Sequence, residues 1–386
     1  MSEDLNRCII EIRSETGSPL GQVAVDVDFA PAFEWTRLAG VRSGRLAFGD
    51  YDKPASVMPL WHVKLSRPYL QGFRIQLDSA VTAGFHCDFS ATYFKGLATQ
   101  AAALLVKAGK MRLNDRFFYL ITAYPGETGA DEGNGGALEI QDIAPAIPVR
   151  ESVFSRFMRI ATARDCADTG LLPVFIPGRV LAEVSSITQQ AQQIETGGFL
   201  IGHLHHDAAS ADVFVEVAAQ VPATGTVGEQ SKLRFTSESW TAVRSALRLR
   251  RREEMLLGWW HSHPVRHWNC QDCPPEKQKV CPLTRGFLSE QDQSLHRAVF
   301  SRAWCIAMVV SDVSYGDPGI AVFGWNEGML EARGFYVLDS LSPELDEFPG
   351  AADPIDCGDR KGSGDTVSAR PGGLPVGAMN LHQQEE

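Results

Sequence analysis

Two histidines lie close together at the end of an apolar segment, with one serine between them. The segment is residues 255–260, and His261 and His263 follow it two positions apart. Because alternate residues of a strand project to the same side, both imidazoles could bind a single divalent metal. A catalytic zinc also needs a third protein ligand and an open position, and Asp292, in the amphipathic segment that begins at Ser289, can supply a carboxylate. These residues therefore predict a metal site built from two histidines and one aspartate.

The order of these residues resembles the signature of the JAMM (MPN-plus) zinc metalloisopeptidases. That signature places a glutamate on an early strand, followed by the pattern H-[ST]-H-P and then by S-x-x-D. Here Glu195 opens the stretch ETGGFLIG, residues 261–264 read HSHP, and Ser289 precedes Asp292 by three positions. Several parts of the motif occur in the right order, and the resemblance covers about residues 173–338.

The resemblance implies a role for each residue of the motif. His261, His263 and Asp292 would bind Zn²⁺. Glu195 would act as the general base on the attacking water, and Ser289 would hydrogen-bond the oxyanion of the tetrahedral intermediate. Elementary chemistry agrees, because zinc lowers the pKa of bound water towards about 7 and a nearby carboxylate can accept the proton. Taken alone, each residue also has an ordinary structural role, such as a helix cap for Ser289, so their joint order is what indicates a site.

The same resemblance implies a metallopeptidase that hydrolyses isopeptide or peptide bonds at the C-terminus of ubiquitin or a ubiquitin-like modifier. The expected partners are the modifier or its conjugates, and modifier-conjugating enzymes that would bind the N-terminal domain. The alternative is a non-catalytic MPN scaffold or protein-interaction module, although such relatives typically lose the metal ligands that this chain retains. A zinc nucleobase deaminase is excluded, because that signature requires H-x-E and His263 stands where the glutamate is needed.

A cysteine-rich insert separates the histidine pair from the aspartate. The family has a shorter spacing here, and the additional residues at 265–288 contain His267, Cys270, Cys273 and Cys281. These ligand types at this spacing predict a second, structural Zn²⁺ site, because the insert has little apolar surface with which to order itself. The alternative is a loop with three free thiols.

Length, composition and charge bound the fold and exclude several functions. The 386 residues exceed one typical domain, and 44% apolar with 22% charged residues is ordinary for a globular protein. A formal net charge of −11 argues against nucleic acid as a partner. The sequence shows no apolar run of membrane-spanning length and no signal peptide, so no membrane association is expected. The cysteines outside the insert are scattered, which is typical of free thiols in a reducing compartment, and we expect a cytoplasmic protein.

The pattern along the chain predicts an α/β protein with an MPN-type mixed-sheet sandwich in its C-terminal half. Residues 1–125 are predicted to form a separate α+β accessory domain of unrecognised family, with alternating strands and an Ala-rich helix at 91–108. A Gly-rich linker and connector follows at 126–172. The catalytic domain at 173–342 shows helices and strands in the order of the MPN fold. Residues 343–386 are rich in Pro, Gly and acidic residues, which predicts a disordered tail.

Two weaker signals are interpreted as structural. His203, His205 and His206 follow the Glu195 segment, and the acidic and small residues around them predict surface positions in a hairpin loop. Cys87 precedes a helix and faintly resembles the thioester cysteine of ubiquitin-conjugating folds. A single cysteine without a supporting motif nevertheless predicts an incidental thiol.

If the insert binds a second zinc, replacing Cys270 and Cys273 together by serine removes that ion and leaves the catalytic one. We expect this double variant to lose a single zinc ion per chain and to be cleaved faster by a protease, because metal binding orders the segment. Substrate binding should weaken more than the chemical step. Mass spectrometry of the zinc content and limited proteolysis measure these effects. An unchanged zinc content would contradict the second site.

Overall fold

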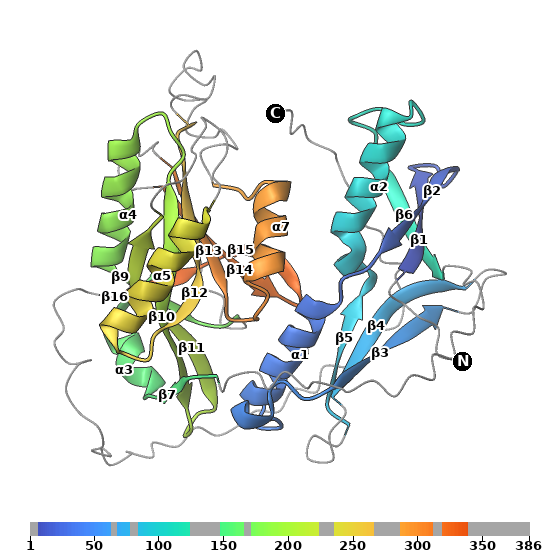
Figure 1. Ribbon diagram of the computed structural model, residues 1–386. Helices are drawn as coiled ribbons and strands as arrows, with labels where there is room; N and C mark the ends of the chain where they lie inside the picture. Colours follow the sequence, from blue (N-terminus) through green and yellow to red (C-terminus); the bar gives the residue numbers. More distant parts are fainter. Residues whose placement is uncertain are drawn as a thin grey trace, which may run out of the picture.

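The structure is a computed structural model that describes residues 7–62, 68–77, 84–123, 147–165, 171–223, 235–265, 286–311 and 319–338. These residues form an N-terminal unit and a larger C-terminal unit (Figure 1). In chain order, the N-terminal unit contains β1 (Arg7–Ser14), β2 (Pro19–Asp26), α1 (Ala30–Arg42), the 3-10 helix η1 (Phe48–Asp50), β3 (Ala55–His62), β4 (Tyr69–Leu77), β5 (His86–Ser90), the 3-10 helix η2 (Ala91–Phe94), α2 (Lys95–Lys107) and β6 (Phe117–Ala123). The C-terminal unit contains β7 (Val149–Glu151), α3 (Phe154–Arg159), β8 (Ala161–Arg164), β9 (Val174–Pro177), α4 (Gly178–Ala191), β10 (Gly197–Asp207), β11 (Asp212–Pro222), α5 (Ser237–Arg250), β12 (Met255–His263), α7 (Glu290–Val299), β13 (Ile306–Ser311), β14 (Gly319–Asn326), β15 (Met329–Arg333) and β16 (Phe335–Leu338).

Two three-stranded antiparallel sheets build the N-terminal unit, with the strand orders β2-β1-β6 and β3-β4-β5. Side chains alternate between the two faces of β1, so Ile10 and Ile12 both point into a core. The buried alanines of α2 enter the same core. In the same core, the Phe73 ring packs edge-on against Phe29 and stacks on Phe89. The α+β fold predicted for the N-terminal region is therefore confirmed over the described residues.

A mixed sheet forms the C-terminal unit. Over the described residues it has 10 strands in the order β15-β14-β13-β12-β10-β11-β9-β16-β8, with β7 paired to β10. Helix α4 packs against β9, β11 and β13, and α5 packs against β11. The central strands β12 and β13 are apolar along most of their length because both faces of the sheet are covered there. The mixed α/β sheet predicted for this half is confirmed, and β7 and β8 extend it into residues predicted as a connector.

Helix α1 lies between the two units (Figure 1). It contacts β4 and β5 of the N-terminal unit and β11 and β14 of the C-terminal unit. No residue from Pro31 to Arg42 is exposed, and Leu38 and Val41 belong to the apolar core of the large sheet. The sequence pattern does not predict this helix, because a helix that is buried on more than one face has no polar stripe to reveal its period.

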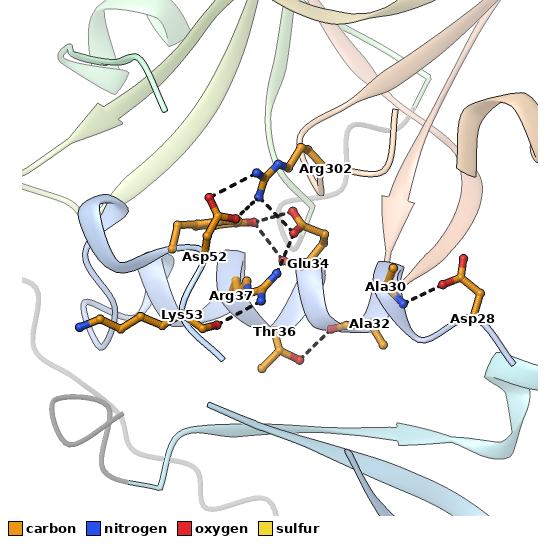
Figure 2. Close-up of polar contacts among 10 residues, drawn as sticks. Asp28, Ala30, Ala32, Glu34, Thr36, Arg37, Asp52, Lys53 and Arg302 are labelled. Carbon is orange, nitrogen blue, oxygen red and sulfur yellow. Dashed lines mark hydrogen bonds and ion pairs between the residues drawn. The ribbon is translucent and has the colours of Figure 1, made fainter. Parts of the chain in front are cut away.

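Arg302 adds an ionic contact between α1 and the C-terminal unit (Figure 2). Its guanidinium donates to Glu34 Oε1 at 3.2 Å and also pairs with the carboxylate of Asp52. The Tyr51 hydroxyl donates to Glu34 Oε2 at 3.3 Å, and the Tyr51 ring packs edge-on against Trp304 at 5.2 Å. Burial raises the pKa of the Glu34 carboxyl, and the adjacent guanidinium groups oppose that shift. The units thus share a partly buried charge cluster as well as an apolar contact.

None of the helices in the described ranges combines the length and the apolar character that crossing a membrane requires. The predicted linker and tail fall largely outside the described residues. The boundaries predicted at residues 125 and 342 therefore stay predictions.

Replacing Arg302 by alanine tests the ionic contact between the units. The change leaves the buried Glu34 carboxylate with Arg37 and the Tyr51 hydroxyl as its partners. We expect the free energy of unfolding to fall by about 1–3 kcal/mol in urea denaturation, because a charge-assisted hydrogen bond is lost at a mostly buried carboxylate. The control is Arg7→Ala, which removes an exposed pair with Asp26 and should cost less than about 1 kcal/mol. Equal losses in the two variants would contradict a stabilising role for Arg302.

Candidate metal centre

Strand β12 carries two histidines in the middle of the large sheet. It runs antiparallel to β10 and parallel to β13, and it is buried from Leu257 to its end. His261 and His263 project from the same face, and their Nε2 atoms lie 2.9 Å apart. Burial lowers the pKa of both imidazoles to about 3, so both are neutral near pH 7. Two neutral imidazole nitrogens therefore converge on one point.

Helix α7 brings a carboxylate to these histidines. Ser289 is the N-cap of α7 and forms a capping box with Asp292, in which Asp292 N donates to Ser289 Oγ at 3.2 Å and Ser289 N donates to Asp292 Oδ2 at 2.8 Å. The cap orients the Asp292 carboxylate, whose Oδ2 lies 3.7 Å from His261 Nε2. The ligand atoms of His261, His263 and Asp292 all lie within 4.8 Å of one another. In the part of the chain that the structure describes, this is the one cluster with such spacing.

Glu195 lies directly before β10, the antiparallel neighbour of β12. The residues next to it fix the pairing, because Thr196 N donates to Ser262 Oγ at 2.9 Å and Ser262 N donates to Thr196 O at 2.7 Å. The register of β10 on β12 pairs Gly197 with His261, so Glu195 precedes the pairing at the same end of β12 as the two histidines. The Glu195 side chain is buried, with 7% relative exposure. The structure thus brings the predicted general base and the predicted metal ligands to one end of the same two strands.

The hydroxyl of Ser289 is engaged within the capping box. It donates its proton to Asp292 Oδ2 at 2.7 Å. A hydroxyl carries a single proton, so this group cannot donate to a substrate oxyanion at the same time. The role predicted for Ser289 therefore requires that its hydrogen bond to Asp292 be exchanged during the reaction.

The predicted second zinc site lies in residues 266–285, outside the described residues, with its four candidate ligands His267, Cys270, Cys273 and Cys281. It stays a prediction. The first residues described after this segment lie against the metal centre, since the Phe287 ring packs on that of His263 at 4.7 Å. The insert therefore rejoins the fold beside the predicted ligands.

A second group of histidines lies further along β10 and is not brought to the metal centre. The prediction of surface positions is wrong for His203 and His205, which belong to β10 and are 5% and 3% exposed, while His206 is half-buried. The two nitrogens of His205 hydrogen-bond with Ser152 Oγ at 2.7 Å and Glu216 Oε2 at 3.0 Å. The signal that could reveal their burial is the apolar run from Phe199 to Ile201 that leads into them, because such a run is typical of a strand buried on both faces.

The described cysteines have no features of reactive thiols. Cys8, Cys87 and Cys305 are free. Burial raises the pKa of Cys8 and Cys305 to about 12, and it also raises the pKa of Cys87. Because the thiolate is the nucleophile, the surroundings of Cys87 give no support to a thioester role.

Part of the chain is similar to a known protein family. Residues 169–273 match the profile of the family described as JAB1/Mov34/MPN/PAD-1 ubiquitin protease, a stretch that includes the glutamate and both histidines but ends before Ser289 and Asp292. No curated protein matches the chain. Among solved structures, it is similar to protein DSY2949 from Desulfitobacterium hafniense, a solution structure with 18% identity and a TM-score of 0.31, over 44% of this chain and 97% of that one. The matched residues, which are similar to this family, lie within the mixed sheet of the C-terminal unit, and a separate N-terminal unit precedes them.

His203 should make the stability of this domain sensitive to acid. Burial lowers its pKa from the ordinary 6.5 to about 4, so the unfolded chain binds a proton in this range that the folded protein does not. The stability linked to His203 is therefore fully present above the unfolded pKa and is lost as the pH falls towards the folded pKa.

We expect His203→Gln to reduce the fall in unfolding free energy between about pH 7 and about pH 5, as measured by urea denaturation at both pH values. His86→Gln, at an exposed strand position of the N-terminal unit, is the matched control and should keep the slope of the parent protein. A slope that is unchanged in His203→Gln would contradict the assignment.

Proposed function

We propose that this protein is a zinc-dependent metallopeptidase of the JAMM type, which hydrolyses isopeptide or peptide bonds at the C-terminus of ubiquitin or a ubiquitin-like modifier. The observation that carries the proposal is the convergence of two neutral imidazoles and a carboxylate within 4.8 Å, beside a buried glutamate. These donors suit zinc, and three protein ligands leave one position of a tetrahedral site for water. The family match supports the MPN class, and the modifier substrate follows from the resemblance of the motif.

His261, His263 and Asp292 would hold the ion. When bound, zinc supplies a Lewis acid that activates a water molecule at neutral pH. Glu195 accepts a proton from the attacking water and returns it to the leaving amine, so that no covalent intermediate with the protein is required. The burial of Glu195 and of the histidines lowers the local dielectric constant, which strengthens the interaction of the glutamate with developing charge.

Ser289 would stabilise the oxyanion by donating its hydroxyl proton. In the capping box this proton is bonded to Asp292 Oδ2, so Asp292 and the oxyanion compete for it. A carboxylate that coordinates a cation is a weaker acceptor, because the cation draws electron density from its oxygens. Metal binding by Asp292 would therefore favour the transfer of this hydrogen bond to the substrate.

A non-catalytic MPN scaffold is the alternative function. A scaffold requires neither two neutral imidazoles nor an acid buried next to them. Burial of such polar groups lowers stability unless each is compensated, so apolar residues would serve a scaffold better. The presence of the complete set, Glu195, His261, His263, Ser289 and Asp292, favours the enzyme.

Glu195→Gln separates metal binding from proton transfer. Because Glu195 is not a ligand in this proposal, the variant should retain zinc by mass spectrometry yet lose about 10²–10⁴-fold in turnover. Turnover is measured on a panel of ubiquitin and ubiquitin-like proteins fused at their C-termini to a reporter. His261→Ala should instead lose the metal. Glu238→Gln, at an exposed position of α5, is the matched control. A fully active Glu195→Gln enzyme would falsify the mechanism.

A further inference from the structure

Trp259 and His296 connect β12 to α7 next to the metal centre. Trp259 lies two residues before His261 on the same face of β12, and the two rings stack with centroids 4.8 Å apart and planes 13° apart. The indole Nε1 of Trp259 donates to Nδ1 of His296 at 3.2 Å. His296 lies on α7, four residues after Asp292, so both side chains leave the helix on the side of β12.

Helix α7 thus approaches β12 at two levels. At the first level, Asp292 Oδ2 lies 3.7 Å from His261 Nε2. At the second level, one helical turn further on, His296 is bonded to Trp259. At 3.7 Å the first approach is too long for a hydrogen bond. The bond between His296 and Trp259 therefore limits the rotation and the sliding of α7 on β12, and with them the position of the Asp292 carboxylate.

The chemistry of His296 indicates that its hydrogen bond with Trp259, rather than packing, is the reason for a histidine at this position. An indole nitrogen only donates, and an imidazole nitrogen accepts only when it carries no proton. Burial lowers the pKa of His296 to about 3, which keeps Nδ1 free to accept. Its Nε2 has no hydrogen-bond partner among the described residues, where Phe300 and Trp325 surround the ring. An apolar side chain would avoid the cost of burying this unpaired donor, but it could not accept from Trp259.

We propose that Trp259 and His296 are positioning residues of the metal centre, whose hydrogen bond holds α7 against β12 so that Asp292 meets His261 and His263. The inference rests on the proposed function, because it needs those three residues to be metal ligands. Neither member of the pair is among the proposed ligands, which are His261, His263 and Asp292. The property that the pair controls is the affinity for the metal, because a displaced carboxylate leaves a two-histidine site.

The test measures Zn²⁺ affinity of the purified full chain by competition with a chelator. His296→Leu removes the acceptor, and Trp259→Phe keeps a ring over His261 while removing the donor. Each variant should bind Zn²⁺ about 10–100-fold more weakly than the parent protein. His296→Asn is the conservative variant, since its Oδ1 takes the place of Nδ1, and it should restore most of the affinity. The double variant should bind no more weakly than either single one, because both changes break the same bond.

Two further measurements separate positioning from a general loss of structure. Circular dichroism and thermal unfolding show whether each variant is folded, and Trp259→Phe serves if His296→Leu does not fold. Absorption spectra of the Co²⁺-substituted proteins report the ligand geometry directly, and they should change in His296→Leu and recover in His296→Asn. A role limited to stability would lower the unfolding temperature and leave the Zn²⁺ affinity and the Co²⁺ spectrum unchanged, which would overturn the inference.

The outcome also distinguishes this inference from the proposed function. A parent protein that binds Zn²⁺ but cleaves no modifier, with affinity reduced in His296→Leu and Trp259→Phe, would refute the peptidase and support the positioning pair. A parent protein that cleaves modifiers, with affinity unchanged in both folded variants, would refute the positioning pair alone. A parent protein that binds no Zn²⁺ would refute both.

Discussion

The register of β10 on β12 is the constraint on which the rest of the centre depends. Side chains alternate along a strand, so a slip of one residue would turn both histidines to the opposite face and carry Glu195 away from them. The paired hydrogen bonds between Thr196 and Ser262 fix this register where the site begins. The other side of β12 is equally constrained, because a Cβ on Gly258 would lie 1.9 Å from Ile306 O of β13. The glycine in front of the tryptophan pair is thus required by the close approach of two strands.

The sequence predicts the elements that bury one face and expose the other, and those whose residues form a known motif. Helices α4 and α5 each have one apolar face, and β10, β11 and β12 are rich in apolar and β-branched or aromatic residues, so these elements are predictable from the sequence. Helix α1 is not predictable in this way because both units cover it. The burial of His203 and His205 is not predicted when histidine is counted as polar, because β10 is covered on both faces and buries its polar residues with its apolar ones.

The geometry of the centre is predictable only in part. The motif indicates Glu195, His261, His263, Ser289 and Asp292 from the order of residue types, although an insert lengthens the spacing before Ser289. The bond between Trp259 and His296 has no such signal, because it joins a strand and a helix that are separated by that insert. The engagement of the Ser289 hydroxyl by Asp292 also depends on atomic positions that a spacing of three residues does not specify.

Helix α1 has a consequence for how this protein can change during evolution. Its residues from Pro31 to Arg42 pack into both units, so a substitution there must suit two surfaces at once. A domain that is joined only through a linker can be exchanged by recombination without altering its neighbour. Here an exchanged N-terminal domain would uncover the side of the large sheet that Leu38 and Val41 fill, and would leave Trp304 without the ring of Tyr51. The two units are therefore expected to be inherited together, with correlated changes across α1.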